Sequence, residues 1–90
     1  MAIIAYMTNW CSDCSRSRRV LQKSGVAFVE IDIDKTPGAE DSMRTLNGGS
    51  GKVPTILLDG PNGRIVLIEP TDRELNDALS ASSTAMSRTQ

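Results

Sequence analysis

Two cysteines three positions apart, Cys11 and Cys14, have the most recognisable chemistry in this sequence. They follow a short apolar segment, residues 2–6, that predicts a buried strand, and they precede a segment with helical spacing that ends at Gly25. Two thiols at this spacing can form and break a disulfide. The first N–H groups of a helix have no partner within it, so a sulfur placed there is favoured as the reactive thiolate. The pattern predicts redox chemistry centred on Cys11.

Zinc binding and a permanent disulfide are the alternatives for these two cysteines. A structural zinc site usually takes four ligands from Cys and His. The sequence has two cysteines and no histidine, so zinc would need a second subunit or carboxylates. A disulfide that closes so short a loop constrains the unfolded chain very little. We therefore expect a redox-active pair and no bound metal.

The length and charge of the chain restrict its class and its partners. Ninety residues predict one domain with a modest core. Ten Lys and Arg residues against eleven Asp and Glu residues give a net charge of −1, which does not favour a nucleic-acid partner. No apolar run approaches a membrane span, and no signal peptide is recognisable. A dithiol without a secretion signal is typical of the reducing cytosol. We expect a cytoplasmic monomer with no membrane association.

The hydrophobic pattern predicts four strands and three helices. The expected strands are 2–6, 26–34, 52–58 and 64–68, and the expected helices run from about 12 to 24, from 36 to 46 and from 71 to 81. A crossover through the first helix makes the first two strands parallel, and a turn at 59–63 pairs the last two as a hairpin. The result is an α/β fold of order βαβαββα, with a four-stranded mixed sheet and helices on both faces. The domain is expected to span residues 1–81, with a disordered tail over 82–90.

Three local signals carry this assignment. Thr36-Pro37 predicts a helix start, because a capping hydroxyl precedes a proline at the first helical position. Alternation within the second strand places Val29, Ile31 and Ile33 on one face. Residues 71–74 predict a capping box at the start of the last helix.

This order of elements and three motifs resemble the thioredoxin fold in its short, glutaredoxin form. The resemblance covers about residues 2–81. The motifs are Tyr6 at the end of the first strand, Trp10-Cys11-Ser12-Asp13-Cys14 at the start of the first helix, and Val53-Pro54-Thr55 entering the third strand.

The resemblance implies a thiol–disulfide oxidoreductase. In this family Cys11 would attack a disulfide as thiolate, and Cys14 would resolve the mixed disulfide that results. Pro54 would be cis and would lie against the dithiol. The backbone of Val53 could then pair with an extended substrate as an added strand would. The implied partners are disulfide-containing proteins, mixed disulfides of small thiols and a disulfide reductase system.

Other residues are expected to shape the substrate site. Thr8 and Trp10 would form its rim, and Trp10 could equally serve as a hydrophobic cap. Thr71 and Asp72, at the start of the last helix, would receive the polar end of a low-molecular-weight thiol.

The thiol co-substrate is predicted from one departure and one further match. Glutaredoxins that use glutathione commonly carry Gly-Gly before the last helix, where this chain has Glu69-Pro70 and proline has no N–H. The loop 46–49, followed by Val53-Pro54, looks most like the mycoredoxins, which reduce mixed disulfides with mycothiol. Ser12-Asp13 between the cysteines differs from the Pro-Tyr or Gly-Tyr that is usual in glutaredoxins. We expect mycothiol rather than glutathione as co-substrate, and no tightly bound cofactor.

Two alternative functions remain open at this point. The protein could donate electrons to ribonucleotide reductase and be recharged by thioredoxin reductase. It could instead be a scaffold in which Cys11 from two subunits and two external thiols hold a 2Fe–2S cluster. Recharging by a flavin-dependent reductase with NADPH would favour the first alternative. A brown colour and visible absorbance after anaerobic purification would favour the second.

Overall fold

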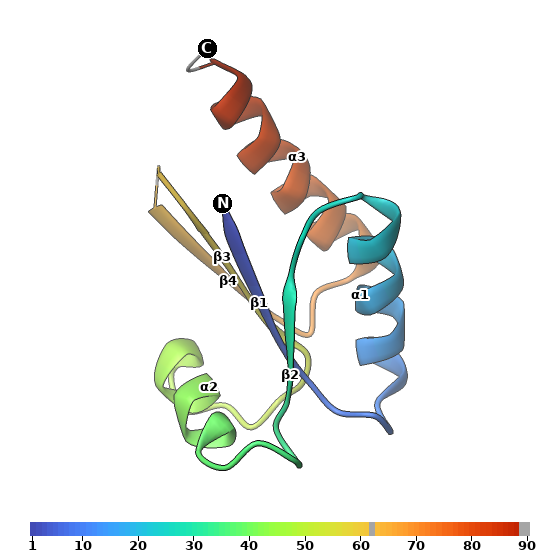
Figure 1. The fold of residues 1–90 in the computed structure, drawn as a ribbon, viewed down its shortest axis with the longest axis vertical. Helices are drawn as coiled ribbons and strands as arrows, with labels where there is room; N and C mark the ends of the chain where they lie inside the picture. The colour runs from blue at the N-terminus through green and yellow to red at the C-terminus, as the bar shows by residue number, and fades with distance from the viewer. Residues whose placement is uncertain (62, 89–90) are drawn as a thin grey trace.

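In the computed structural model, this protein folds as a four-stranded sheet with helices on both faces (Figure 1). The structure describes residues 1–61 and 63–88, with side chains described as far as residue 81. Its elements, in chain order, are β1 (Ala2–Met7), α1 (Ser12–Lys23), β2 (Val29–Asp32), α2 (Ala39–Asn47), β3 (Thr55–Gly60), β4 (Gly63–Ile68) and α3 (Asp72–Arg88).

The strand order in the sheet is β2-β1-β3-β4. β1 runs parallel to β2, while β3 is antiparallel to both β1 and β4. The parallel pair follows from the crossover through α1, and the antiparallel pair β3–β4 follows from the hairpin. In Figure 1, α1 and α3 lie together on one side of the sheet and α2 lies on the other. The predicted fold is confirmed.

The core lies on both sides of the central strand β1. Ala5 and Met7 of β1 are fully buried. Each helix buries one large side chain against the sheet completely: Leu21 from α1, Met43 from α2 and Leu75 from α3. Each such burial stabilises the fold by roughly 1.5–3 kcal/mol. None of the helices that the structure describes combines the length and the apolarity needed to cross a membrane.

The start of α2 differs from the prediction. The helix begins at Ala39 and not at Thr36-Pro37, and no side chain caps it. The carbonyl of Asp32 accepts the N–H groups of Lys35 at 3.2 Å and Thr36 at 3.0 Å, which draws this segment into a turn. Gly38 then adopts a left-handed conformation, with φ of 79°, which glycine reaches without the steric cost that a Cβ atom would add. The local turn overrides the capping signal.

β2 is shorter than predicted and its first residue is not in the core. Val29 is 58% exposed, although Ile31 and Ile33 pack against the core as expected. β2 is an edge strand, and α2 packs mainly against β1 and β4. The beginning of β2 is therefore left uncovered.

The predicted capping box opens α3. The N–H of Glu74 donates to Thr71 Oγ1 at 3.1 Å, and the N–H of Thr71 donates to Glu74 Oε1 at 2.8 Å. The helix continues to Arg88, beyond the domain end expected at residue 81. Within the tail expected over 82–90, the backbone of 82–88 belongs to α3, whereas the side chains of 82–88 and the whole of 89–90 lie outside the described part of the chain. The disordered tail stays a prediction.

Candidate active site

Cys11 caps the N-terminus of α1 with its sulfur. The residue has extended backbone angles, φ −92° and ψ 118°, and its Sγ accepts the N–H of Cys14 at 3.3 Å. The thiol is partly exposed and lies 3.7 Å from the carbonyl oxygen of Val53, to which it donates. The sulfur thus sits where the unpaired N–H groups and the helix dipole favour negative charge.

Cys14 lies one turn further along α1 and is completely buried. Burial, with a smaller contribution from the neighbouring Cys11 sulfur, raises the pKa of the Cys14 thiol from 9.0 to about 12. At neutral pH, Cys14 is therefore a protonated thiol. The two sulfurs therefore differ in access: Cys11 is partly exposed, whereas Cys14 is buried.

Val53 and Pro54 bring a second segment of the chain to the dithiol. The Val53-Pro54 peptide bond is cis, and both residues are buried. The Pro54 carbonyl accepts the N–H of Glu69 at 2.8 Å. The Cys11 sulfur, the Val53-Pro54 bond and the segment before α3 therefore lie next to one another.

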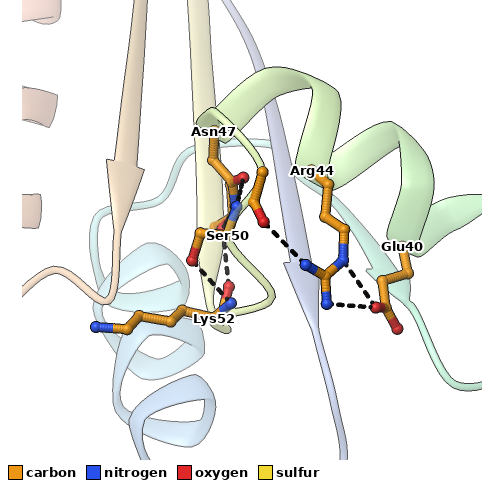
Figure 2. Close-up of polar contacts among 7 residues, drawn as sticks. Glu40, Arg44, Asn47, Ser50 and Lys52 are labelled. Carbon is orange, nitrogen blue, oxygen red and sulfur yellow. Dashed lines mark hydrogen bonds and ion pairs between the residues drawn. The ribbon is translucent and has the colours of Figure 1, made fainter.

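The loop that carries Val53 is held to α2 by the guanidinium of Arg44. Arg44 pairs with Glu40 one turn earlier and donates to the carbonyl of Gly49 at 2.9 Å (Figure 2). A Cβ atom on Gly51 would lie 2.5 Å from Arg44 Nη2, so the loop backbone passes close against this side chain. The sequence did not predict the contact between Arg44 and the Gly49 carbonyl, because the glycine-rich loop has the pattern of a flexible segment.

Asn47, at the end of α2, ties the other side of the same loop to β3. Its side chain accepts the N–H of Ser50 at 2.8 Å and donates to Thr55 Oγ1 at 3.0 Å. Thr55 Oγ1 donates in turn to the Lys52 carbonyl at 3.0 Å, and the Lys52 N–H donates to Ser50 Oγ at 3.1 Å. Figure 2 shows this network closing around the loop just before Val53. The sequence signal that could have indicated this network is Asn47 itself, because a side-chain amide next to a glycine-rich loop can hydrogen-bond the loop backbone.

The structure corrects the predicted place of Thr8. Its side chain is 1% exposed, so it cannot line the rim of the site. Thr8 lies in the short segment, residues 8–11, that joins β1 to α1. Its hydroxyl oxygen is buried without a hydrogen-bond partner among the described residues.

Trp10 stands at the surface beside Cys11. Its side chain is 75% exposed, which argues against a packed hydrophobic cap. The indole Nε1–H donates to Asp34 Oδ2 at 2.8 Å. This carboxylate comes from the turn after β2, a contact that the sequence did not predict. The contact fixes the indole at the mouth of the site.

The donors before and at the start of α3 are largely occupied. Glu69 has a left-handed backbone, φ 47°, and its N–H binds Pro54. Pro70 is buried and has no N–H. The N–H of Thr71 is taken by Glu74. This leaves the first N–H groups of α3 itself, beside the Asp72 carboxylate.

Asp72 also faces α1. With Arg16, Arg19 and Lys23 of α1, it lines a hollow of about 280 Å³ between the two helices. Arg16 is paired with Asp13 in the first turn of α1. Thr71 and Asp72, the residues expected to bind a small thiol, are both exposed.

Among the described residues, no group of three or more His, Cys, Asp or Glu side chains is placed to hold a metal ion.

Comparison with known proteins identifies relatives of this arrangement. The family model described as Glutaredoxin matches residues 3–61. A Mycobacterium tuberculosis (strain H37Rv) protein named as a glutaredoxin is 34% identical over 55 residues, which are 61% of this chain and 66% of that protein. The chain thus matches slightly less than two thirds of this relative's length. The glutaredoxin-like protein NrdH of Salmonella typhimurium is 28% identical over 57 residues, 63% of this chain and 68% of that protein.

A solved structure extends the likeness over most of the fold. The glutaredoxin grx-1 of Archaeoglobus fulgidus superposes with a TM-score of 0.71 at 25% identity, covering 86% of this chain and 85% of that one. The matched family region includes both cysteines and the Val53-Pro54 bond. The chain belongs to the glutaredoxin family.

Proposed function

We propose that this protein is a cytoplasmic, monomeric thiol–disulfide oxidoreductase that works through Cys11 and Cys14. The observation that carries the proposal is the contrast between the two sulfurs. Cys11 is partly exposed at the start of α1, whereas Cys14 is fully buried with a pKa of about 12. Only one of the two is therefore available as a thiolate nucleophile toward a substrate in solution.

The reaction proceeds by two exchanges. The Cys11 thiolate attacks one sulfur of a substrate disulfide, a Cys11–substrate disulfide forms, and the other substrate sulfur leaves and takes a proton. Cys14 then attacks the Cys11 sulfur, which releases the second substrate thiol and closes the Cys11–Cys14 disulfide. Alternatively, a small thiol attacks the Cys11 sulfur of the mixed disulfide, forms a new disulfide with Cys11 and releases the substrate thiol. In both routes the substrate gains two electrons.

The backbone at Val53 supports binding of an extended substrate. Its carbonyl oxygen lies 3.7 Å from the Cys11 sulfur, so a substrate chain bonded to that sulfur would begin next to this backbone. An added strand at this point would pair main chain with main chain and would be tolerant of side-chain identity. Disulfide-containing proteins and mixed disulfides of small thiols are the substrates that we propose.

Mycothiol is the small thiol that the donor pattern favours. The charged γ-glutamyl end of glutathione needs free N–H groups, but the Glu69 N–H is bound to Pro54, Pro70 has none and the Thr71 N–H is bound to Glu74. The carboxylates of Glu69 and Asp72 add repulsion. An unpaired charged group costs about 1–3 kcal/mol or more, and about 1.4 kcal/mol is tenfold in affinity. The sugar hydroxyls of mycothiol need no anion site.

A second candidate function is electron donation to a ribonucleotide reductase with recharging by thioredoxin reductase. The observation that favours it is the similarity to the Salmonella typhimurium protein named NrdH. The same loss of glutathione donors before α3 would suit a protein that takes electrons from a flavoprotein reductase. The two candidates differ in their electron source.

The test compares three recharging systems on one model mixed disulfide, with NADPH consumption as the readout. The systems are mycothiol with its reductase, glutathione with its reductase, and thioredoxin reductase alone. We expect mycothiol to support turnover at least about tenfold faster than glutathione. The double variant Glu69→Gly, Pro70→Gly should narrow this gap by restoring a donor, once thermal unfolding shows that it is folded.

Equal or better turnover with glutathione would remove mycothiol from the account and leave the dithiol chemistry standing. Fast recharging by thioredoxin reductase alone would favour the second candidate. The Cys11→Ser variant is the control, because it should be inactive with all three systems.

A further inference from the structure

The hydroxyl of Thr8 is the feature of the core that packing does not explain. Thr8 is 1% exposed, and its Oγ1 is the buried side-chain oxygen or nitrogen without a hydrogen-bond partner in the part of the chain whose side chains are described. A buried hydroxyl without a partner destabilises a fold, and valine would fill the same volume without that cost. An unpaired buried hydroxyl therefore needs an explanation other than packing.

Thr8 lies beside the resolving sulfur. It directly follows β1 (Ala2–Met7), in the segment that leads into α1, and Cys14 is fully buried in the first turn of that helix. The main-chain N–H and the hydroxyl of Thr8 both act on the Cys14 sulfur as donors that lower the pKa of its thiol. The contact is not an established hydrogen bond while the sulfur carries its proton, because the hydroxyl is without a partner.

We propose that Thr8 is the hydrogen-bond donor that stabilises the negative charge on Cys14 in the resolving step. The inference deepens the function proposed above and rests on it. While Cys14 is a thiol, it needs no strong donor. When it becomes a thiolate inside the protein, bulk water cannot reach it, and the Thr8 hydroxyl has no other partner among the described residues to give up before it donates.

The step balances without any further reactant. The Cys14 thiol loses its proton, its sulfur attacks the Cys11 sulfur of the mixed disulfide, and the Cys11–substrate bond breaks. The departing substrate thiolate takes up one proton. A Cys11–Cys14 disulfide and a free substrate thiol are formed, so one disulfide is exchanged for another.

Few other groups can supply this stabilisation. Of the titratable or charged groups that act on Cys14, Cys11 opposes its ionisation, and it is part of the mixed disulfide at this stage. Arg18, one turn further along α1, senses the charge of Cys14 but is bound through two hydrogen bonds to Glu30, at 2.7 and 2.8 Å. The main-chain N–H of Thr8 also acts on the Cys14 sulfur, but it is present whatever the side chain, so the Thr8 hydroxyl is the uncommitted side-chain donor.

The test separates the two exchanges with a chromophoric aromatic disulfide, 5,5′-dithiobis(2-nitrobenzoate), in stopped flow. Attack by Cys11 releases one coloured thiolate, and attack by Cys14 releases the second. In Thr8→Val, we expect the first phase to be unchanged and the second to slow by at least about tenfold at pH 7, the scale of a lost hydrogen bond to a charged group. The pH at which the second phase reaches half of its maximum should rise. Thr8→Ser, which keeps the hydroxyl, should restore the second phase to within about threefold.

Unfolding in urea is the control for a purely structural role. We expect Thr8→Val to be at least as stable as the unmodified protein, so a slower second phase cannot be explained by a loosened fold. An unchanged second phase in Thr8→Val, with the first phase intact, overturns the role of Thr8 and leaves the proposed function standing. A second phase that persists in Cys14→Ser overturns both, because Cys14 would then not be the resolving thiol.

Discussion

The indole nitrogen of Trp10 donates a 2.8 Å hydrogen bond to the carboxylate of Asp34, 24 residues later in the chain. The bond joins the segment before Cys11 to the turn that follows β2. An exposed indole without a partner could sample many orientations, whereas this one is directed by a charged acceptor. The finding makes Trp10 a fixed wall of the site and Asp34 its anchor.

Removing the anchor should free the indole. We expect Asp34→Ala to lower the fluorescence anisotropy of Trp10, which is the single tryptophan of the chain, and to raise KM for a mixed disulfide a few-fold with little change in kcat. Asp77→Ala, an exposed carboxylate on α3, is the matched control and should change neither quantity. An Asp34→Ala protein with unaltered anisotropy would show that the bond does not hold the indole in solution.

Asp13 should restrain the reactivity of Cys11. Its carboxylate lies in the first turn of α1 and competes with the Cys11 thiolate for the same helix end, although Arg16 partly offsets it. Asp13→Asn should therefore increase the rate of Cys11 alkylation at neutral pH, by about tenfold or less because exposed charges are screened. Arg16→Gln should have the opposite effect. A slower alkylation of Asp13→Asn would remove Asp13 from the account.

The buried thiol of Cys14 should make the fold sensitive to alkali. Its pKa is raised by burial to about 12, whereas a thiol in the unfolded chain titrates near 9.0. Above the lower value, the unfolded state has lost a proton that the folded state keeps, so stability is complete below it and falls as the pH rises. We expect the free energy of unfolding of the reduced protein, from urea titrations, to decline between about pH 9 and about pH 11. The decline should be smaller in Cys14→Ser, and equal declines would contradict the burial argument.

Asn47 should matter for both stability and activity. It makes two hydrogen bonds that hold the loop before Val53, one to Thr55 and one from Ser50. Asn47→Ala leaves partly buried partners unpaired and should cost about 1–3 kcal/mol, with slower disulfide reduction because Val53 is held less firmly. Thr45→Ala, on the same helix but exposed, should change stability by about 0.5 kcal/mol or less. A similar loss in both variants would mean that the loop network adds nothing specific.

Local patterns predicted the parts of the site that depend on neighbouring residues. The strand before Cys11, the helix after it and the capping box of Thr71 and Glu74 all follow from short-range spacing, and all are present. The cis bond before Pro54 was expected only from the family resemblance, since no local pattern specifies it.

Features that depend on tertiary contacts were not predictable in the same way. The burial of Thr8 depends on how the segment between β1 and α1 packs in the folded chain, and a single threonine after a strand gives no sign of it. The Trp10–Asp34 bond requires β2 to lie beside β1 first. At Thr36-Pro37, a sound local signal was overridden by the turn that Asp32 organises.

The identity of the attacking sulfur is the central claim, and the site of a trapped adduct tests it most directly. Reduced Cys14→Ser and Cys11→Ser proteins are each mixed with an equimolar peptide disulfide at pH 7, quenched with acid, and the adduct is located by mass spectrometry. The account predicts a rapid, stoichiometric adduct on Cys11 in Cys14→Ser, and no adduct on the same timescale in Cys11→Ser, where the remaining thiol is buried and protonated. An adduct on Cys14 that forms as fast as the one on Cys11 would contradict it.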